Sequence, residues 1–560
     1  MLTNEELSTS IAETVWGHRF RSGQRGVEYT LEFLNVMAGT DYNFNAPKYK
    51  RKKMIGFRQF VFEGEKEGRD NNNYVSFSPE AKGIIKKELK VNNNELNDIQ
   101  DFLKNLKVEI RQQNGAPTNR SWYAQFLFPL HESMLFFELR NKNGSISYEH
   151  NFFSRGGELY YLALSNGLKN NPALANSIKE KIEALLSSNK NIGNLISRIN
   201  RVIAESCYCS ENTVCEKCSN TKDTKESNEN AYLYKPENLV SNTNYPKLAV
   251  NESPLFNLMA EELDSLLEAR LDIHDTFRYL TSLICIQLYR YMIDRCNQIQ
   301  LNGVSDKMGD ASDYCIFMDC TDGQNKQIKH LAEQSYKSHQ HIVKLAFDKI
   351  LTDNIQKRLP IELAIEKIQE WKKAAANSEE KVKYKKYEEF FKELGYNRLK
   401  EKKKNLLISA IENPDENSAY NMLLVQMKAI AGESQSKNDF AILNVLGKDG
   451  GFYAGGVGTT YRYSMSDTLI NALVLALLGN EKRMTFDAFK RKLFESYHIV
   501  IGTAEADLTN VIKQKRVSFG TFKENELRFR QKLKKNGLLE EFSDATAFIV
   551  NPAYFMEEYR

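Results

Sequence analysis

The sequence has no apolar run long enough to cross a membrane. Its longest run, residues 472–478, falls far short of the roughly 20 residues that a spanning helix needs. The opening residues, MLTNEELSTSIAETVW, are acidic and amphipathic, whereas a secretory leader is basic and then apolar. Together these absences predict a cytoplasmic protein that has no membrane partner.

Familiar catalytic motifs are missing as well. The chain contains no P-loop, no Gly-x-Ser-x-Gly, no His-Glu-x-x-His and no Rossmann fingerprint. The glycine-rich stretch 447–458 lacks the Gly-Lys-Ser/Thr that would make it a Walker A motif. No repeat of solenoid period occurs. Missing motifs do not exclude catalysis, but they favour a binding protein over an enzyme.

An excess of one charge is absent too, because the formal net charge is only +4 over 560 residues. Any nucleic-acid site must therefore come from local clustering of basic residues. The hydrophobic content of 41% is ordinary for a globular protein, and the length predicts about three or four domains. We expect an N-terminal α+β domain (1–165), a helical segment with a metal site and polar linker (166–250), a helical domain with a charged arm (251–445) and a C-terminal domain (446–560).

Cysteines are few, but four of the eight fall within twelve residues: Cys207, Cys209, Cys215 and Cys218. Four thiolates can close a tetrahedral Zn²⁺ site with no vacant position, which predicts a structural metal and no catalysis by it. The flanking residues are too polar to bury free thiols in a core. An iron–sulfur cluster or a redox-active set is the alternative.

The last hundred residues predict a compact module. Apolar patterning with Ser, Thr and Gly at the ends favours three helices and two short strands. The predicted helices are 468–478, 486–497 and 523–535, and the strands are 538–542 and 546–550. This order resembles a winged helix-turn-helix, although the insert 499–519 is longer than that fold usually carries.

The third of these helices has an apolar back and a basic front. Phe522, Phe529 and Leu533 fall on one face at helical spacing. The basic residues on and beside the other face are Arg528, Arg530, Lys532, Lys534 and Lys535, with Lys513, Lys515 and Arg516 upstream. Such a helix can pack inward while it neutralises the phosphates of duplex DNA. That function requires an exposed helix whose cations stay clear of acidic neighbours; a solvated face or a protein-docking module is the alternative.

A strand–turn–helix unit offers a different function. Residues 314–320 predict a buried strand, and a helix follows over 328–351. Asp319 and Asp322 lie at the carboxyl end of that strand, where open α/β sheets bind ligands. A metal-dependent nuclease or phosphotransferase centred on these two aspartates is therefore the second hypothesis. A simple capping turn explains the same residues, and no further ligand set is identifiable.

The rest of the chain predicts mostly helix. Segments 4–15, 27–38, 78–106, 171–204 and 253–300 have helical patterns, and the second half of the last is apolar all round, which predicts a buried central helix. Residues 352–440 are helical and heavily charged, which favours an exposed arm able to dock a partner. Strands are expected near 57–64, 122–128 and 134–139. The fold class is thus mainly α with small β elements (α+β), multidomain and zinc-stabilised, with a C-terminal winged helix-turn-helix.

Four features in this order carry a resemblance: FSRGGELYYLALSNG, the four-cysteine cluster, CIFMDCTDG and YRYSMSDTLINALVLALLG. They are similar to large uncharacterised bacterial proteins found with methylation-associated and phosphorothioation-associated anti-phage defence systems. The resemblance spans most of the chain. It implies a non-enzymatic or cryptic component that works on DNA with ATPase, nuclease or methyltransferase partners, and it assigns no catalytic residue. A protein-docking scaffold without DNA contact is the third hypothesis.

Overall fold

The computed structural model describes most of the chain. The described residues are 4–20, 25–44, 55–65, 74–108, 126–135, 139–142, 145–148, 156–187, 189–205, 247–309, 314–376, 380–393, 396, 399–437, 439–456, 458–509, 512, 517–542 and 546–557. The fold is mainly helical with short strands, which confirms that part of the predicted class.

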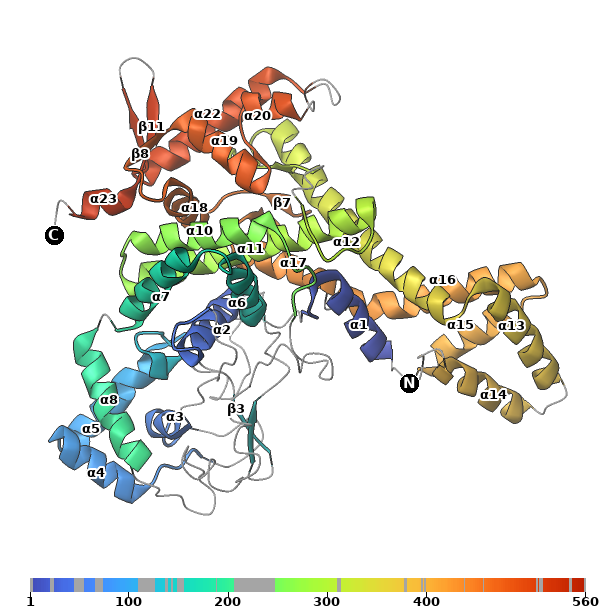
Figure 1. The fold of residues 1–560 in the computed structure, drawn as a ribbon, viewed down its shortest axis with the longest axis horizontal. Helices are drawn as coiled ribbons and strands as arrows, with labels where there is room; N and C mark the ends of the chain where they lie inside the picture. Colours follow the sequence, from blue (N-terminus) through green and yellow to red (C-terminus); the bar gives the residue numbers. More distant parts are fainter. Residues whose placement is uncertain are drawn as a thin grey trace.

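A pair of helices, α10 (Pro254–Glu268) and α11 (Ile273–Asn302), lies at the centre of the molecule (Figure 1). Asp272 caps α11 by accepting from the backbone N–H groups of His274 and Asp275. Almost every residue of α11 from Ile273 to Ile299 is buried, so the predicted central helix is confirmed. Its neighbours include α2 (Gly26–Gly39), α12 (Lys326–Arg358), α17 (Asp439–Asp449) and α18 (Asp467–Leu478).

The N-terminal third is mostly helical where it is described. It comprises α1 (Asn4–Trp16), α2, α3 (Ile55–Val61), α4 (Pro79–Leu89), α5 (Asn93–Asn105), α6 (Gly156–Gly167), α7 (Pro172–Ser187) and α8 (Lys190–Glu205). The strand expected at 57–64 is wrong, because Phe57, Phe60 and Val61 bury one side of a helix at i, i+3 and i+4 spacing.

The short strands of this third only partly match the expectation. β1 (Lys107–Val108) pairs with β2 (Phe126–Leu127), and β3 (Leu139–Lys142) pairs with β4 (Ser145–Tyr148), both antiparallel. Of the strand expected at 122–128, only 126–128 are described, and β2 lies there. At 134–139 the expectation is wrong at its start, since Met134 ends a 3₁₀ turn (Glu132–Met134) that His131 caps.

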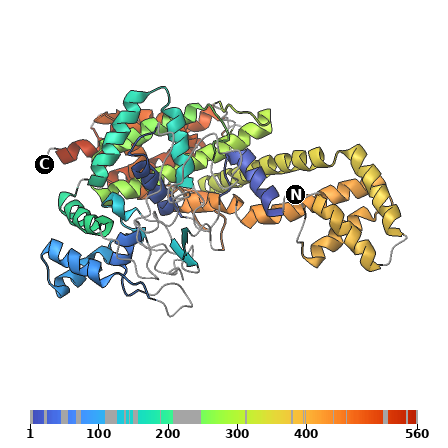
Figure 2. The ribbon, with the colours of Figure 1, turned by 60° about the horizontal axis from the view of Figure 1, so that its bottom comes forward.

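A helical arm projects from this body, as Figure 2 shows. It is formed by the far half of α12 with α13 (Ile361–Ala376), α14 (Glu380–Glu393), α15 (Glu401–Ile411) and α16 (Glu416–Lys437). Where it is described, the charged segment 352–440 is therefore mainly helical, as predicted. From the arm the chain returns through α17 to the hairpin of β6 (Tyr453–Ala454) and β7 (Arg462–Tyr463).

The described residues between 464 and 557, hereafter the C-terminal module, lie on the opposite side of α10 and α11 from the N-terminal helices (Figure 1). In order they form α18, β8 (Arg483–Thr485), α19 (Phe486–Tyr497), β9 (Ile499–Val500), α20 (Thr503–Leu508), α22 (Phe519–Lys535), β10 (Leu539–Glu541), β11 (Ala547–Val550) and α23 (Pro552–Glu557). A three-stranded antiparallel sheet has the order β10–β11–β8.

The strand–turn–helix unit packs against this module. β5 (Ile316–Phe317) pairs in parallel with β9, with Ile316 opposite Ile499 and Phe317 opposite Val500. Phe317 also joins a small apolar cluster with Val500 and Phe522. The predicted strand at 314–320 is thus real but shorter than expected, and its partner comes from the insert 499–519.

Buried residues from all four expected domains belong to one large apolar cluster, which runs from Ile11 to Ile549. Within the described residues, none of the helices combines the length and the apolar character needed to cross a bilayer.

Candidate functional site at helix α22

The apolar back of α22 lies as predicted. Phe522, Phe529 and Leu533 are buried, and the Phe529 ring lies 6.0 Å from that of Phe486 and 6.5 Å from that of Phe489. The helix begins four residues earlier than expected, because the Ser518 hydroxyl accepts from the backbone N–H of Gly520 and caps it.

A buried asparagine on the same face ties three segments together, and the sequence analysis missed it. The Asn525 side chain accepts from the backbone N–H of Cys320 and donates to the carbonyls of Met318 and Ile501, each at 2.9 Å. An asparagine between Phe522 and Phe529 on an apolar stripe is the signal that could have identified it.

A buried lysine on the neighbouring helix was missed as well. Lys490 of α19 is almost fully buried, and its ammonium lies 3.0 Å from Glu526 of α22 and 3.9 Å from Glu505 of α20. Asp487 of α19 lies 3.2 Å from the same ammonium, so three helices of the module share one ion-pair cluster around Lys490, which fixes α22 against them.

The predicted basic residues are mostly paired with carboxylates. Lys532 lies 2.6 Å from Asp322, Lys534 lies 2.9 Å from Glu541, and Lys535 lies 3.7 Å from Asp467. Arg530 lies 3.8 Å from Glu526 and 4.5 Å from the centre of the Phe486 ring. Arg528 differs, because it donates to the side-chain oxygens of Gln324 and Gln531, each at 3.1 Å. The expectation that these cations stay clear of acidic neighbours is therefore wrong for four of the five, and an anion that binds them must displace their carboxylates.

The solvent exposure of these ion pairs determines how easily another anion can replace their carboxylates. The side chains of Lys534 and Lys535 are 67% and 77% exposed, and their carboxylate partners are exposed too. Exposed ion pairs contribute about 0–1 kcal/mol, because water and salt screen them. Both lysines can therefore exchange their carboxylates for another anion at little cost.

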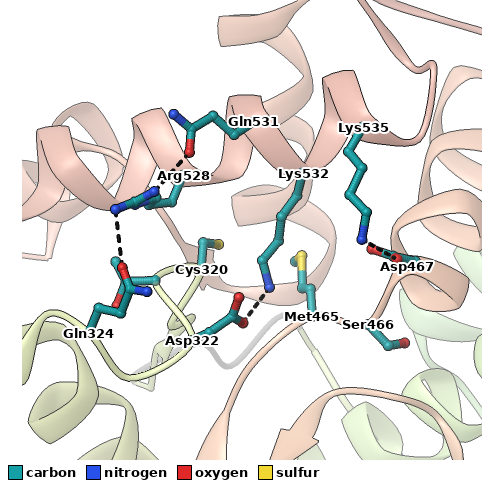
Figure 3. Close-up of a pocket in the computed structure, with 11 residues that line it drawn as sticks. Cys320, Asp322, Gln324, Met465, Ser466, Asp467, Arg528, Gln531, Lys532 and Lys535 are labelled. Carbon is teal, nitrogen blue, oxygen red and sulfur yellow. Dashed lines mark hydrogen bonds and ion pairs between the residues drawn. The ribbon is translucent and has the colours of Figure 1, made fainter.

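A cavity of about 410 Å³ lies between α22 and the body (Figure 3). Arg528, Lys532 and Lys535 extend from the helix toward it. Its opposite side is formed by the turn that carries Asp322 and by Ser466 and Asp467 at the start of α18. The volume falls within the range of small-molecule sites.

The start of α18 lines this cavity through Ser466 and Asp467. The Ser466 hydroxyl accepts from the backbone N–H of Leu469 and caps the helix. No described residue accepts a hydrogen bond from the backbone N–H of Asp467 or Thr468. The first N–H groups of a helix carry a partial positive charge and favour anions. Cys320 also lines the cavity; burial raises the pKa of its thiol, so the group is neutral.

The two aspartates of the strand–turn–helix unit have different surroundings. Asp319 is fully buried, accepts from Arg462 Nε at 2.7 Å, and accepts from the backbone and hydroxyl of Thr321 at 2.8 and 2.7 Å. Asp322 is 67% exposed on a turn with φ of +55°. Asn325, not an aspartate, caps the following helix.

A metal centre gains no support at these aspartates. Arg462 and Thr321 already satisfy the Asp319 carboxylate, and within the described residues no group of three His, Cys, Asp or Glu side chains is placed to hold a metal ion. Cys207, Cys209, Cys215 and Cys218 lie outside the described residues, as do Lys513, Lys515 and Arg516.

No protein-family model matches the chain, and none of the curated proteins matches it either.

Proposed function

We propose that this protein binds duplex DNA through its C-terminal module, with α22 as the recognition helix and the β10–β11 hairpin as the wing of a winged helix-turn-helix. One observation carries the proposal. The strand between the first two helices, β8, pairs with the second strand of the hairpin, and α22 comes directly before that hairpin. This arrangement leaves one side of α22 exposed next to the wing.

The exposed side of α22 has the chemistry that a major groove requires. Lys523 and Lys534 supply positive charge, Gln531 is an amide that can read adenine, and Leu527 can contact a thymine methyl group; all four are exposed. At about 1.5 Å per residue, seventeen residues give a helix of roughly 25 Å, long enough to lie in the groove.

The intramolecular ion pairs set the expected strength of binding. Phosphates must replace Glu541 at Lys534 and Asp467 at Lys535, so each contact gains less than a free lysine would provide. We therefore propose moderate, strongly salt-dependent affinity, in which partner proteins or the predicted upstream cluster Lys513, Lys515 and Arg516 supply the remainder.

Fluorescence anisotropy at several salt concentrations tests this proposal, with the full chain and a blunt duplex that has 5′-hydroxyl ends. Replacing Lys523, Lys534 and Lys535 with Gln should weaken binding about tenfold or more and reduce the salt slope by about three. The matched control replaces three exposed lysines of the arm, Lys392, Lys400 and Lys402, with Gln. Equal affinity of the two triple variants would contradict the proposal.

A structural zinc ion remains part of the proposed function. Four thiolates in the spacing Cys-x-Cys-x5-Cys-x2-Cys fit a tetrahedral Zn²⁺ site chemically. Elemental analysis should find about one zinc per chain, lost when Cys215 and Cys218 become Ser. The control is Cys315→Ser, because Cys315 is a free cysteine elsewhere in the chain. Full zinc content in the double variant would contradict the assignment.

The resemblance to defence-associated proteins supports a place in a multi-protein anti-phage complex beside an ATPase or nuclease. A second candidate function, a protein-docking scaffold, is favoured by apolar side chains exposed along the arm. Leu406 of α15 and Met422 and Val425 of α16 are exposed on adjacent helices. Val425→Glu should abolish co-purification with a partner while duplex binding persists; loss of duplex binding alone in the lysine variant would exclude a scaffold-only role.

A further inference from the structure

We propose that the cavity between α22 and the start of α18 binds a phosphate monoester, and that Asp322 occupies the site until the phosphate displaces it. The inference goes beyond the proposed function, because the central cations of the cavity, Arg528 and Lys532, contact Gln324 and Asp322 of the body, and the cavity shares only Gln531 and Lys535 with the proposed duplex surface. Phosphate binding there does not require contact with a duplex.

Three cations from one helix converge on this cavity, as Figure 3 shows. Arg528, Lys532 and Lys535 are spaced at i, i+4 and i+7, so their side chains leave α22 along one line. The Lys532 side chain is only 17% exposed, whereas that of Lys535 is 77% exposed, so Lys532 is the more buried of the two lysines. A guanidinium with two ammonium groups is a donor set that suits a phosphate dianion.

The start of a second helix, α18, lines the same space through Ser466 and Asp467. The backbone N–H groups of Asp467 and Thr468 open α18 without an acceptor among the described residues. The positive end of that helix and the cations of α22 therefore lie on opposite sides of one cavity. A tetrahedral anion between them can accept from both sides, which a flat surface of lysines does not allow.

Asp322 has the features of an exchangeable occupant. Its carboxylate contacts Lys532 at 2.6 Å, and within the described residues Lys532 is its one hydrogen-bond or ion-pair partner. The residue is mostly exposed on a left-handed turn next to Gly323. Asp467, by contrast, also accepts from Asn536 at 3.1 Å, so it is held in place. A phosphate therefore displaces Asp322 and leaves Asp467 at the rim.

The test is specific because substitutions at two contacting residues, Lys532 and Asp322, should change phosphate binding in opposite directions. Isothermal titration of the full chain with sodium phosphate, against sodium chloride at equal ionic strength, measures binding. Lys532→Gln should weaken phosphate binding about tenfold or more, because the best buried donor is lost. Asp322→Asn should strengthen it about threefold, since the competing charge is removed and asparagine tolerates the left-handed backbone. Lys402→Gln, at an exposed lysine of the arm that does not line the cavity, should leave it unchanged.

Three further arms identify the source of the phosphate. AMP, a 5′-phosphorylated single strand and its 5′-hydroxyl counterpart are titrated in the same way. Tighter binding of the phosphorylated strand than of AMP identifies a strand end as the ligand, and equal binding identifies a free nucleotide; both support a phosphate site. If Lys532→Gln fails to fold, Arg528→Gln replaces it, with a loss of about threefold expected.

The inference is overturned if wild-type protein does not bind phosphate, if Lys532→Gln binds it like wild type, or if Asp322→Asn does not bind it more tightly. Its failure is distinguishable from that of the proposed function. The duplex experiment uses 5′-hydroxyl ends and replaces Lys523, Lys534 and Lys535, so neither Lys532 nor Asp322 enters it.

Discussion

Helix α22 makes two kinds of polar contact, and they differ in what can replace them. Beneath the helix, the Asn525 side chain is buried and bonds to the backbone beyond β5, where the fully buried Asp319 pairs with Arg462. Along its basic side, Lys534–Glu541 and Lys535–Asp467 are exposed ion pairs. Removing one partner of a buried pair leaves an uncompensated charge, whereas water or another anion takes over at an exposed pair. The buried contacts therefore position α22, and the exposed ones remain available for binding.

The largest expected effect comes from the buried ion pair. Asp319→Ala should lower the free energy of unfolding by about 3–5 kcal/mol, because Arg462, whose side chain is only 15% exposed, loses its 2.7 Å partner. Urea unfolding of the full chain measures this. Asp322→Asn, three residues away and exposed, should change stability by less than about 1 kcal/mol. Similar losses for the two variants would break the distinction between buried and exposed contacts.

The next effect tests the neutral part of the same junction. Asn525→Ala leaves the Cys320 N–H and the carbonyls of Met318 and Ile501 without partners, which should cost about 2–3 kcal/mol. Thermal unfolding checks the loss. Gln531→Ala, exposed on the other side of the helix, is the control and should be nearly neutral. A neutral Asn525→Ala would mean that apolar packing alone positions α22.

A smaller effect depends on pH and concerns a buried contact between the module and the body. Burial raises the pKa of Glu262 on α10 to about 7, although hydrogen bonds from Tyr497 and Gln287 and the nearby Arg290 lower it. The unfolded chain ionises this carboxyl near its ordinary value of 4.5, so the native state binds more protons between 4.5 and 7. Stability from this group is present at low pH and is lost as the pH rises through about 7.

Replacing the titrating group isolates that loss. Wild type should lose about 2 kcal/mol from Glu262 between pH 5 and pH 8, and Glu262→Gln should not. The variant therefore becomes more stable relative to wild type as the pH rises. Urea unfolding at several pH values measures this difference, and parallel curves for the two proteins would contradict the assignment.

The sequence predicts the local parts of this arrangement well. Helix α19 has the expected bounds, because Thr485 caps its start and His498 ends it in a left-handed conformation. The apolar back of α22 follows directly from the spacing of Phe522, Phe529 and Leu533. A helix with capping residues and a regular apolar stripe can be predicted from its own residues, so its bounds do not depend on the rest of the chain.

The parts that depend on remote segments could not be predicted. Strand β8 has only three residues, and its pairing with β11 makes it a strand. β5 and β9 are far apart in the chain, so neither identifies the other. The basic residues of α22 were identified, but their partners Asp322 and Asp467 come from two distant segments. The positive charge of α22 was therefore predictable from the sequence, whereas the carboxylates that pair with it and the cavity beside it were not.

The smallest effect on stability bears most directly on function. Lys534→Gln removes the exposed pair with Glu541, so the free energy of unfolding should change by less than about 0.5 kcal/mol. The same change should lower the salt slope of duplex binding by about one, because one phosphate contact is lost. A lysine that mattered for structure would change stability and leave the slope intact. Glu541→Gln separates these further: it frees Lys534, so duplex binding should strengthen while stability again stays nearly constant.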